Sequence, residues 1–91
     1  MSPARAIDLF SGCGGLTLGL RQAGFDVIAG VEIDSLAAQT YRVNHPAVRV
    51  WNSDIRSLSA ATVGDELGLC RGELDLLAGC PPVRGFHRYV G

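Results

Sequence analysis

Glycines and acidic residues stand where apolar runs of this sequence end. Gly12, Gly14 and Gly15 belong to a cluster of small residues that follows the apolar run 5–10. Glycine permits a tight turn and lets a ligand come into contact with the backbone. Many turns between a strand and a helix are glycine-rich for packing alone, so the loop by itself leaves a purely structural role open.

Two carboxylates follow the next two runs. Glu32 closes the run 26–32, about twenty residues after Gly12, where an acidic side chain can accept hydrogen bonds from ribose hydroxyls. That spacing suits a dinucleotide and an adenosyl cofactor equally. Asp54 follows the run 48–51 and could accept a hydrogen bond from an adenine amino group. Each also has a plainer interpretation: Glu32 could cap the following helix, and Asp54 could be the N-cap of the next turn.

The elements that must position these residues follow from the hydrophobic pattern. Short apolar runs separated by helical periodicity predict an α/β fold with a parallel sheet. Ligands of such sheets bind beyond the carboxyl ends of the strands, so the glycines and both carboxylates should meet in one crevice. The predicted strands cover residues 5–10, 26–32, 48–51 and 74–78, and the predicted helices cover residues 16–23, 34–44 and 59–69.

Helical spacing also indicates which residues share a helix face. In the first helix Leu16, Leu20 and Ala23 recur at this spacing, and Gly24 should follow the end of the helix. The second helix should have Asp34 as its N-cap and should end near Asn44 and Pro46. One face of this second helix is predicted to hold Leu36, Ala37, Thr40 and Tyr41.

Composition narrows the class of protein. Ninety-one residues suffice for one small domain, residues 1–91, and the formal net charge is -1. The eight basic residues are all arginine and are scattered, so bulk charge does not predict binding to nucleic acid or to a membrane. With no signal peptide or membrane-span pattern, we expect a cytoplasmic protein. Cys13, Cys70 and Cys80 lack metal-site spacing, and their odd number favours reduced thiols.

Four motifs in order resemble the signatures of the DNA cytosine-5 methyltransferases. They are residues 8–16 (DLFSGCGGL), 31–34 (VEID), 52–55 (NSDI), and 79–82 (GCPP) with Gly85 and Phe86 after them. The glycine loop does not meet the G-x-G-x-x-G fingerprint of nicotinamide-binding domains. The resemblance implies a Rossmann-like parallel sheet with flanking helices, the front part of the class I methyltransferase fold.

The resemblance also implies roles around S-adenosylmethionine. Phe10 would pack near its methionine and adenine portions, Glu32 would hold the ribose hydroxyls, and Ile33 would flank the adenine. Asp54 would accept a hydrogen bond from the adenine amino group. The cofactor-binding residues implied are Phe10, Ser11, Gly12, Cys13, Gly14, Gly15, Glu32, Ile33, Asp54 and Ile55.

In this family a cysteine thiolate attacks C6 of a flipped-out cytosine, and C5 then takes the methyl group from the sulfonium. The fourth motif here departs from that pattern, because Val83 stands where the family has the nucleophilic cysteine. Cys80 precedes two rigid prolines and is not expected to replace it. His87 and His45 are expected to be a solvated loop residue and a helix-end residue.

The sequence given stops at Gly91, before the motifs that hold the base and the target-recognition region in the family. We therefore expect a truncated and inactive relative of these enzymes, with DNA as a partner by resemblance only. The alternatives are an S-adenosylmethionine-binding pseudoenzyme and an interaction subunit of a split methyltransferase, whose second polypeptide would supply the missing motifs. No metal site is predicted.

Overall fold

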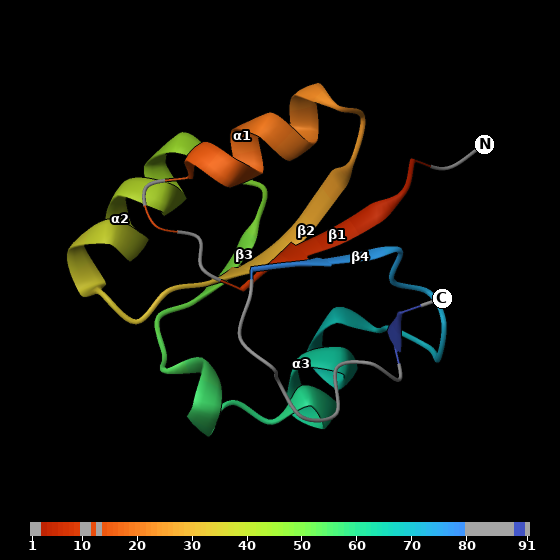
Figure 1. Cartoon of the computed structure of the whole chain (residues 1–91). Coiled ribbons are helices and arrows are strands. Elements are labelled where there is room, and N and C mark those ends of the chain that lie inside the picture. Colours follow the sequence, from red (N-terminus) through yellow and green to blue (C-terminus); the bar gives the residue numbers. More distant parts are fainter. Residues whose placement is uncertain (1–2, 10–11, 13, 80–88, 91) are drawn as a thin grey trace.

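Strands and helices alternate along the chain in the computed structural model, which describes residues 3–9, 12, 14–79 and 89–90. Figure 1 shows the arrangement. The elements are β1 (Arg5–Asp8), α1 (Gly15–Gln22), β2 (Asp26–Val31), α2 (Ser35–Asn44), β3 (Arg49–Trp51), the 3-10 helix η1 (Ile55–Ser57), α3 (Ala60–Leu67) and β4 (Leu76–Ala78). The predicted order of strands and helices is confirmed.

The four strands form one parallel sheet in the order β3-β2-β1-β4. β1 pairs with β2 and with β4, so it lies inside the sheet, and its pairing with β2 shifts register between Ala6 and Ile7. Leu9 continues the pairing beyond β1, because its N–H donates to the carbonyl of Ala78 at 2.8 Å. The carboxyl ends of all four strands therefore point to the same edge of the sheet.

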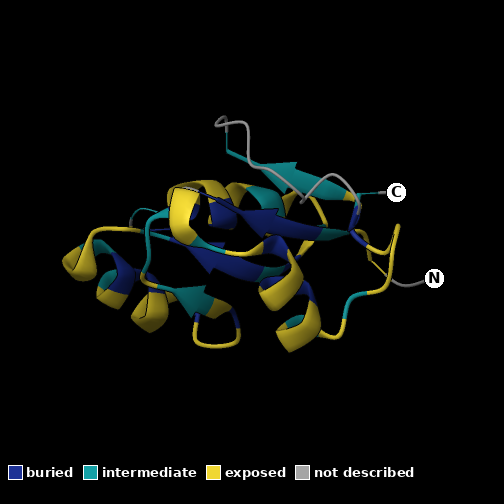
Figure 2. Cartoon of the chain, turned by 90° about the horizontal axis from the view of Figure 1, so that it is seen from below, coloured by how far each residue is buried: buried dark blue, intermediate teal, exposed yellow. Residues whose placement is uncertain are grey.

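Helices cover both faces of this sheet. In Figure 1, α1 and α2 lie on one side and α3 lies on the other. The α1–α2 side buries Ala6, Val27, Tyr41 and Val48. The α3 side buries the larger cluster of Ile7, Leu9, Ala29, Val31, Ile55, Ala60, Val63, Leu74 and Tyr89. Figure 2 shows that the two central strands are buried while the outer faces of the helices are exposed.

Side chains and glycines set the helix ends. Asp34 is the N-cap of α2, as predicted, and its carboxylate accepts from the N–H of Leu36 at 3.2 Å. Ser59 caps α3, and Gly68 ends it in the left-handed conformation at φ 67°. The sequence did not predict η1, whose first turn is capped by Asp54. Among the described residues, no helix combines the length and apolar character needed to cross a membrane.

The buried positions of the first two helices differ in part from the residues that helical spacing groups together. Leu16 is 46% exposed, and the fully buried residue of α1 is Thr17. Leu36 is 70% exposed, whereas Ala38 and Tyr41 are buried. The reason is polar: the hydroxyl of Thr17 hydrogen-bonds both to Asp8 and to Tyr41, which turns this residue and not Leu16 towards the sheet.

Candidate functional site

The strand ends bring the predicted residues to one edge of the sheet. Gly12 follows β1, Glu32 directly follows β2, and Asp54 follows β3. Because β1, β2 and β3 are neighbouring parallel strands, these three positions lie side by side. The crevice expected from the sequence is therefore formed by successive loops of the same edge.

Glu32 connects two of the loops at this edge of the sheet. Its Oε1 accepts from the N–H of Gly12 at 2.8 Å, and its Oε2 accepts from the N–H of Asp34 at 2.8 Å. Because Asp34 caps α2, the simpler interpretation of Glu32 as that helix's cap is wrong. Glu32 instead joins the glycine loop to the β2–α2 loop. Each carboxylate oxygen keeps acceptor capacity beyond these bonds.

Asn52 holds the same loop from β3, a role that the sequence did not reveal. Its amide Nδ2 donates to the carbonyls of Glu32 at 2.9 Å and Ile33 at 3.1 Å. Its Oδ1 accepts from the hydroxyl of Ser35 at 3.0 Å. Asn52 opens the third motif, which was the available signal. It fixes the backbone on both sides of the Glu32 side chain.

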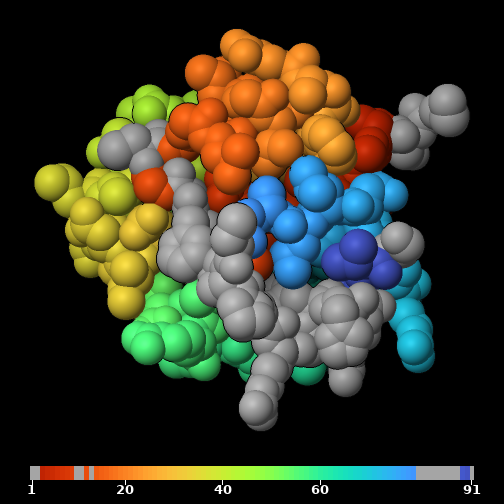
Figure 3. Space-filling model, viewed as in Figure 1, coloured from red at the N-terminus to blue at the C-terminus, as the bar shows by residue number. Residues whose placement is uncertain are grey.

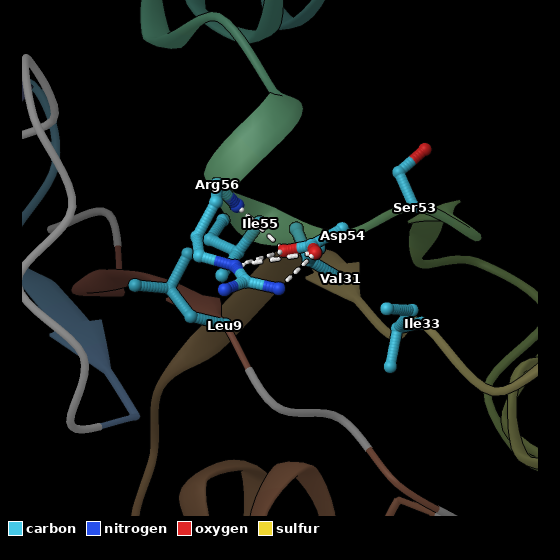
Figure 4. A pocket seen from close by; sticks show the side chains of 7 residues that line it. All are labelled: Leu9, Val31, Ile33, Ser53, Asp54, Ile55 and Arg56. Atoms are coloured by element: carbon cyan, nitrogen blue, oxygen red, sulfur yellow. Dashed lines mark hydrogen bonds and ion pairs between the residues drawn. The ribbon is translucent and has the colours of Figure 1, made fainter.

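A cavity of about 300 Å³ opens at this edge of the sheet, and it is lined by Val31 and Ile33 on either side of Glu32 but not by Glu32 itself. Its walls are largely apolar, and Asp54 and Arg56 give it a charged rim (Figure 4). The lining residues are Leu9, Val31, Ile33, Ser53, Asp54, Ile55 and Arg56. Ile33 is 59% exposed, which is high for so large an apolar side chain. The structure thus brings together Ile33, Asp54 and Ile55, three of the residues predicted to contact one ligand.

The carboxylate of Asp54 is engaged by Arg56. Nη2 of Arg56 donates to Oδ2 at 2.7 Å, and the backbone N–H of Arg56 donates to Oδ1 at 2.9 Å (Figure 4). The side-chain hydrogen bonds from Arg56, followed by its backbone N–H, hold the pKa of Asp54 below its ordinary value. Asp54 is therefore an N-cap, as its simpler interpretation had it, and it also lines the cavity.

The glycines of the loop differ in what surrounds them. Gly12 has a φ of 51°, and a Cβ built there would meet nothing within 4 Å among the described residues. A Cβ on Gly15 would also find open space. Gly14 has a φ of 102°, and its Cβ would lie 2.6 Å from Nε2 of His45. A side chain at Gly12 or Gly15 would thus meet none of the described residues, whereas the glycine at position 14 is required by packing.

A buried polar network supports the loop from below. Asp8 and Thr17 are fully buried, and the hydroxyl of Thr17 donates to Oδ2 of Asp8 at 2.9 Å. The same hydroxyl lies 2.7 Å from the hydroxyl of Tyr41. The network ties together β1, α1 and α2, the three elements around the glycine loop. Sequence reasoning missed it, although Asp8 stands in the first motif.

Some predicted residues lie outside the described part of the chain. These are Phe10, Ser11 and Cys13 of the glycine loop, and the fourth motif with Cys80 and Val83. Cys70 is exposed and reduced, and the nearby Glu73 carboxylate raises the pKa of its thiol. Within the described residues, no cluster of His, Cys, Asp and Glu side chains could hold a metal ion.

Solved structures share the fold of this chain. A crystal structure described as a candidate DNA modification methyltransferase encoded within an E. coli prophage superposes with a TM-score of 0.77 at 40% identity. The match covers 91% of this chain and 24% of the prophage-encoded chain. The Dnmt2 methyltransferase of S. pombe gives a TM-score of 0.66 at 26% identity over the same share of each chain. The fold is the front part of a class I methyltransferase domain.

The sequence comparisons define the family more narrowly. The model of the C-5 cytosine-specific DNA methylases matches residues 4–88, and the chain belongs to this family. It is 36% identical to the type II methyltransferase M.AgeI of Thalassovita gelatinovora over 93% of this chain and 20% of M.AgeI. It is 38% identical to DNA (cytosine-5)-methyltransferase 1 of Rattus norvegicus over 90% of this chain and 6% of the relative. The chain therefore spans about a fifth or less of these relatives.

Proposed function

We propose that residues 1–91 form the S-adenosylmethionine-binding portion of a DNA cytosine-5 methyltransferase domain. The observation that carries the proposal is the placement of the Glu32 carboxylate. It lies at the carboxyl end of β2, is fixed by the N–H groups of Gly12 and Asp34, and stands between two residues that line the cavity, Val31 and Ile33. A carboxylate at this point of an open parallel sheet suits a ribose diol.

The remaining residues fit the other parts of the cofactor. Ile33 and Ile55 offer apolar surface on which an adenine ring can pack, and Asp54 offers an acceptor for its amino group. The open space at Gly12 and Gly15 lets the cofactor approach the loop backbone. When bound, S-adenosylmethionine supplies the methyl group from its sulfonium centre. The described residues bind and orient the cofactor.

Arg56 bears on how the adenine is held. Its guanidinium already donates to both carboxylate oxygens of Asp54, so an adenine amino group must share or displace these bonds. The side chain of Arg56 is 86% exposed, so it can leave Asp54 without breaking buried packing. We therefore assign the larger part of cofactor affinity to Glu32 and the smaller part to Asp54.

Val83 favours a second candidate function. Its isopropyl side chain has no lone pair with which to attack cytosine C6, so the family's covalent step has no nucleophile at this position. A pseudoenzyme that binds S-adenosylmethionine fits this residue, whereas a split methyltransferase fits it only where the second polypeptide brings its own cysteine. The relatives named as DNA methyltransferases make DNA the proposed partner in either case.

Calorimetric titration of the purified chain with S-adenosylmethionine tests the proposal. We expect saturable binding at one site, with S-adenosylhomocysteine as a competitor, because the two ligands share the ribose and adenine that Glu32 and Asp54 recognise. An exposed glutamate far from the crevice provides the matched control: Glu66→Ala should bind like the unmodified chain. Absence of binding to a chain that circular dichroism shows to be folded would overturn the proposal.

A further inference from the structure

We propose that His45 is a positioning residue of the cofactor loop, and that Arg21 selects the tautomer in which it works. His45 follows α2 as its C-cap and is only 5% exposed. Its Nε2 lies 3.2 Å from the carbonyl oxygen of Gly14, which is 31 positions away along the chain. The contact reaches the loop from α2, while Glu32 holds the loop through Gly12.

The tautomer follows from the second contact of the ring. Nη1 of Arg21 lies 3.2 Å from Nδ1 of His45. A guanidinium donates hydrogen bonds and accepts none, so Nδ1 must be the acceptor in this pair. The proton of a neutral imidazole then lies on Nε2, where it can be donated to the Gly14 carbonyl. Arg21 of α1 and His45 of α2 thus act in series on one carbonyl of the loop.

Space around the loop makes this hydrogen bond important. A second cavity, of about 380 Å³, adjoins the loop and is lined by Gly14, Gly15, Leu18, Asn44 and His45. The left-handed conformation of Gly14 is not enforced by a side chain of its own. The Gly14 carbonyl also accepts from the backbone N–H of Leu18 at 2.9 Å, which joins it to α1. The hydrogen bond from His45 is the contact that joins the same carbonyl to the end of α2. The ring of Tyr41, 5.0 Å away, holds the imidazole in place.

The inference rests on the proposed binding of S-adenosylmethionine, because the loop residues at Gly12, Gly14 and Gly15 are among those implied to contact it. Two substitutions separate the two ring contacts. The amide of His45→Gln can reach the Gly14 carbonyl in place of Nε2. The shorter His45→Asn can replace Nδ1 towards Arg21 but cannot reach that carbonyl.

The test combines calorimetry with nitrogen NMR of the imidazole. We expect His45→Asn to weaken S-adenosylmethionine binding by about tenfold and His45→Gln by less than about threefold, since one hydrogen bond separates them. The unmodified chain should carry its imidazole proton on Nε2. Arg21→Ala should give a mixture of tautomers, while Arg42→Ala, an arginine of α2 without a contact to His45, should not.

The outcomes separate this inference from the proposed function. Equal affinities of the Gln and Asn variants, or a proton on Nδ1 in the unmodified chain, would overturn the role of His45. If the unmodified chain does not bind S-adenosylmethionine, the proposed function fails. The tautomer and the hydrogen exchange of the Gly15 and Leu16 amides in each variant still test the positioning of the loop. We then expect faster exchange in His45→Asn than in His45→Gln, and equal rates would refute the inference.

Discussion

Glu32 combines two duties in one side chain, because it organises the glycine loop and faces the proposed ribose site. We expect Glu32→Ala to weaken S-adenosylmethionine binding by about 1.5–3 kcal/mol, and Asp54→Ala by about 1 kcal/mol. Glu32→Gln should also bind weakly, because its amide group would face the N–H of Gly12 or of Asp34 as a second donor. Calorimetry on the three variants measures the order of their losses in S-adenosylmethionine affinity. A larger loss in Asp54→Ala than in Glu32→Ala would contradict it.

The ion pair of Asp54 and Arg56 should make the stability of the folded chain depend on pH. Arg56 lowers the pKa of Asp54, so this pair stabilises the folded chain above the unfolded pKa, near 4, and the stabilisation is lost as pH falls through the folded pKa. Arg56→Gln should raise the pKa of Asp54, and so should added salt, because the pair is exposed. Carbon NMR titration of the carboxyl group measures both. Arg49→Gln, which breaks a different surface pair, should leave Asp54 unchanged.

At the scale of the glycine loop and α1, three alanine substitutions should differ in stability. Gly14→Ala should cost about 2–4 kcal/mol, since it combines a positive φ with overlap on His45. Gly12→Ala should cost about 1–2 kcal/mol, since its φ of 51° is unfavourable and its Cβ would meet none of the described residues. Gly15→Ala, at the first position of α1, should be neutral or stabilise by up to about 1 kcal/mol. Urea unfolding measures all three, and equal losses at Gly12 and Gly14 would contradict the packing argument.

The hydroxyl of Thr17 contributes to the junction of β1, α1 and α2 through its hydrogen bonds to Asp8 and Tyr41. Thr17→Val keeps the volume of the side chain but removes a hydrogen-bond donor from the buried carboxylate of Asp8. We expect it to lower the free energy of unfolding by about 1–3 kcal/mol. Thr62→Val, at an exposed position of α3, is the matched control and should change stability by less than about 0.5 kcal/mol. A neutral Thr17→Val would show that the network does not support the junction.

For the whole molecule, the sequence predicted the sheet well because buried parallel strands are continuous apolar runs. Strand and helix order and parallel pairing were all confirmed. Buried helix faces were less visible, since helical spacing groups Leu16 with Leu20 and Ala23 and does not single out Thr17. The structure buries Thr17 and exposes Leu16, and Figure 3 shows the outer surface of α1 across the top of the molecule. Hydrogen bonds between distant residues decide such cases, and periodicity does not report them.

The candidate site, like the fold, could be predicted from the sequence only in part. The family resemblance implied that Ile33, Asp54 and Ile55 would contact one ligand, and they line one cavity. The contact of His45 with Gly14 was not predictable, because the sequence identifies His45 only as a residue near the end of a helix. The Arg56 guanidinium on Asp54 was also missed, since neighbouring charges are common on surfaces without forming pairs. Local chemistry was thus visible in the sequence, and contacts between loops were not.

The behaviour of the whole chain towards DNA depends on Val83. We expect the 91-residue chain to transfer no methyl group to duplex DNA, because valine cannot add to cytosine C6. Labelled S-adenosylmethionine incubated with mixed-sequence DNA measures transfer.

Val83→Cys should introduce a thiol that iodoacetamide alkylates faster than Cys70, since Arg84 favours its thiolate whereas Glu73 raises the pKa of Cys70. This variant should still be inactive, because the base must also be held as charge develops on it, a task that the family gives to later motifs. Label in cytosine with the unmodified chain would contradict the role of Val83, and label with Val83→Cys alone would show that four motifs suffice.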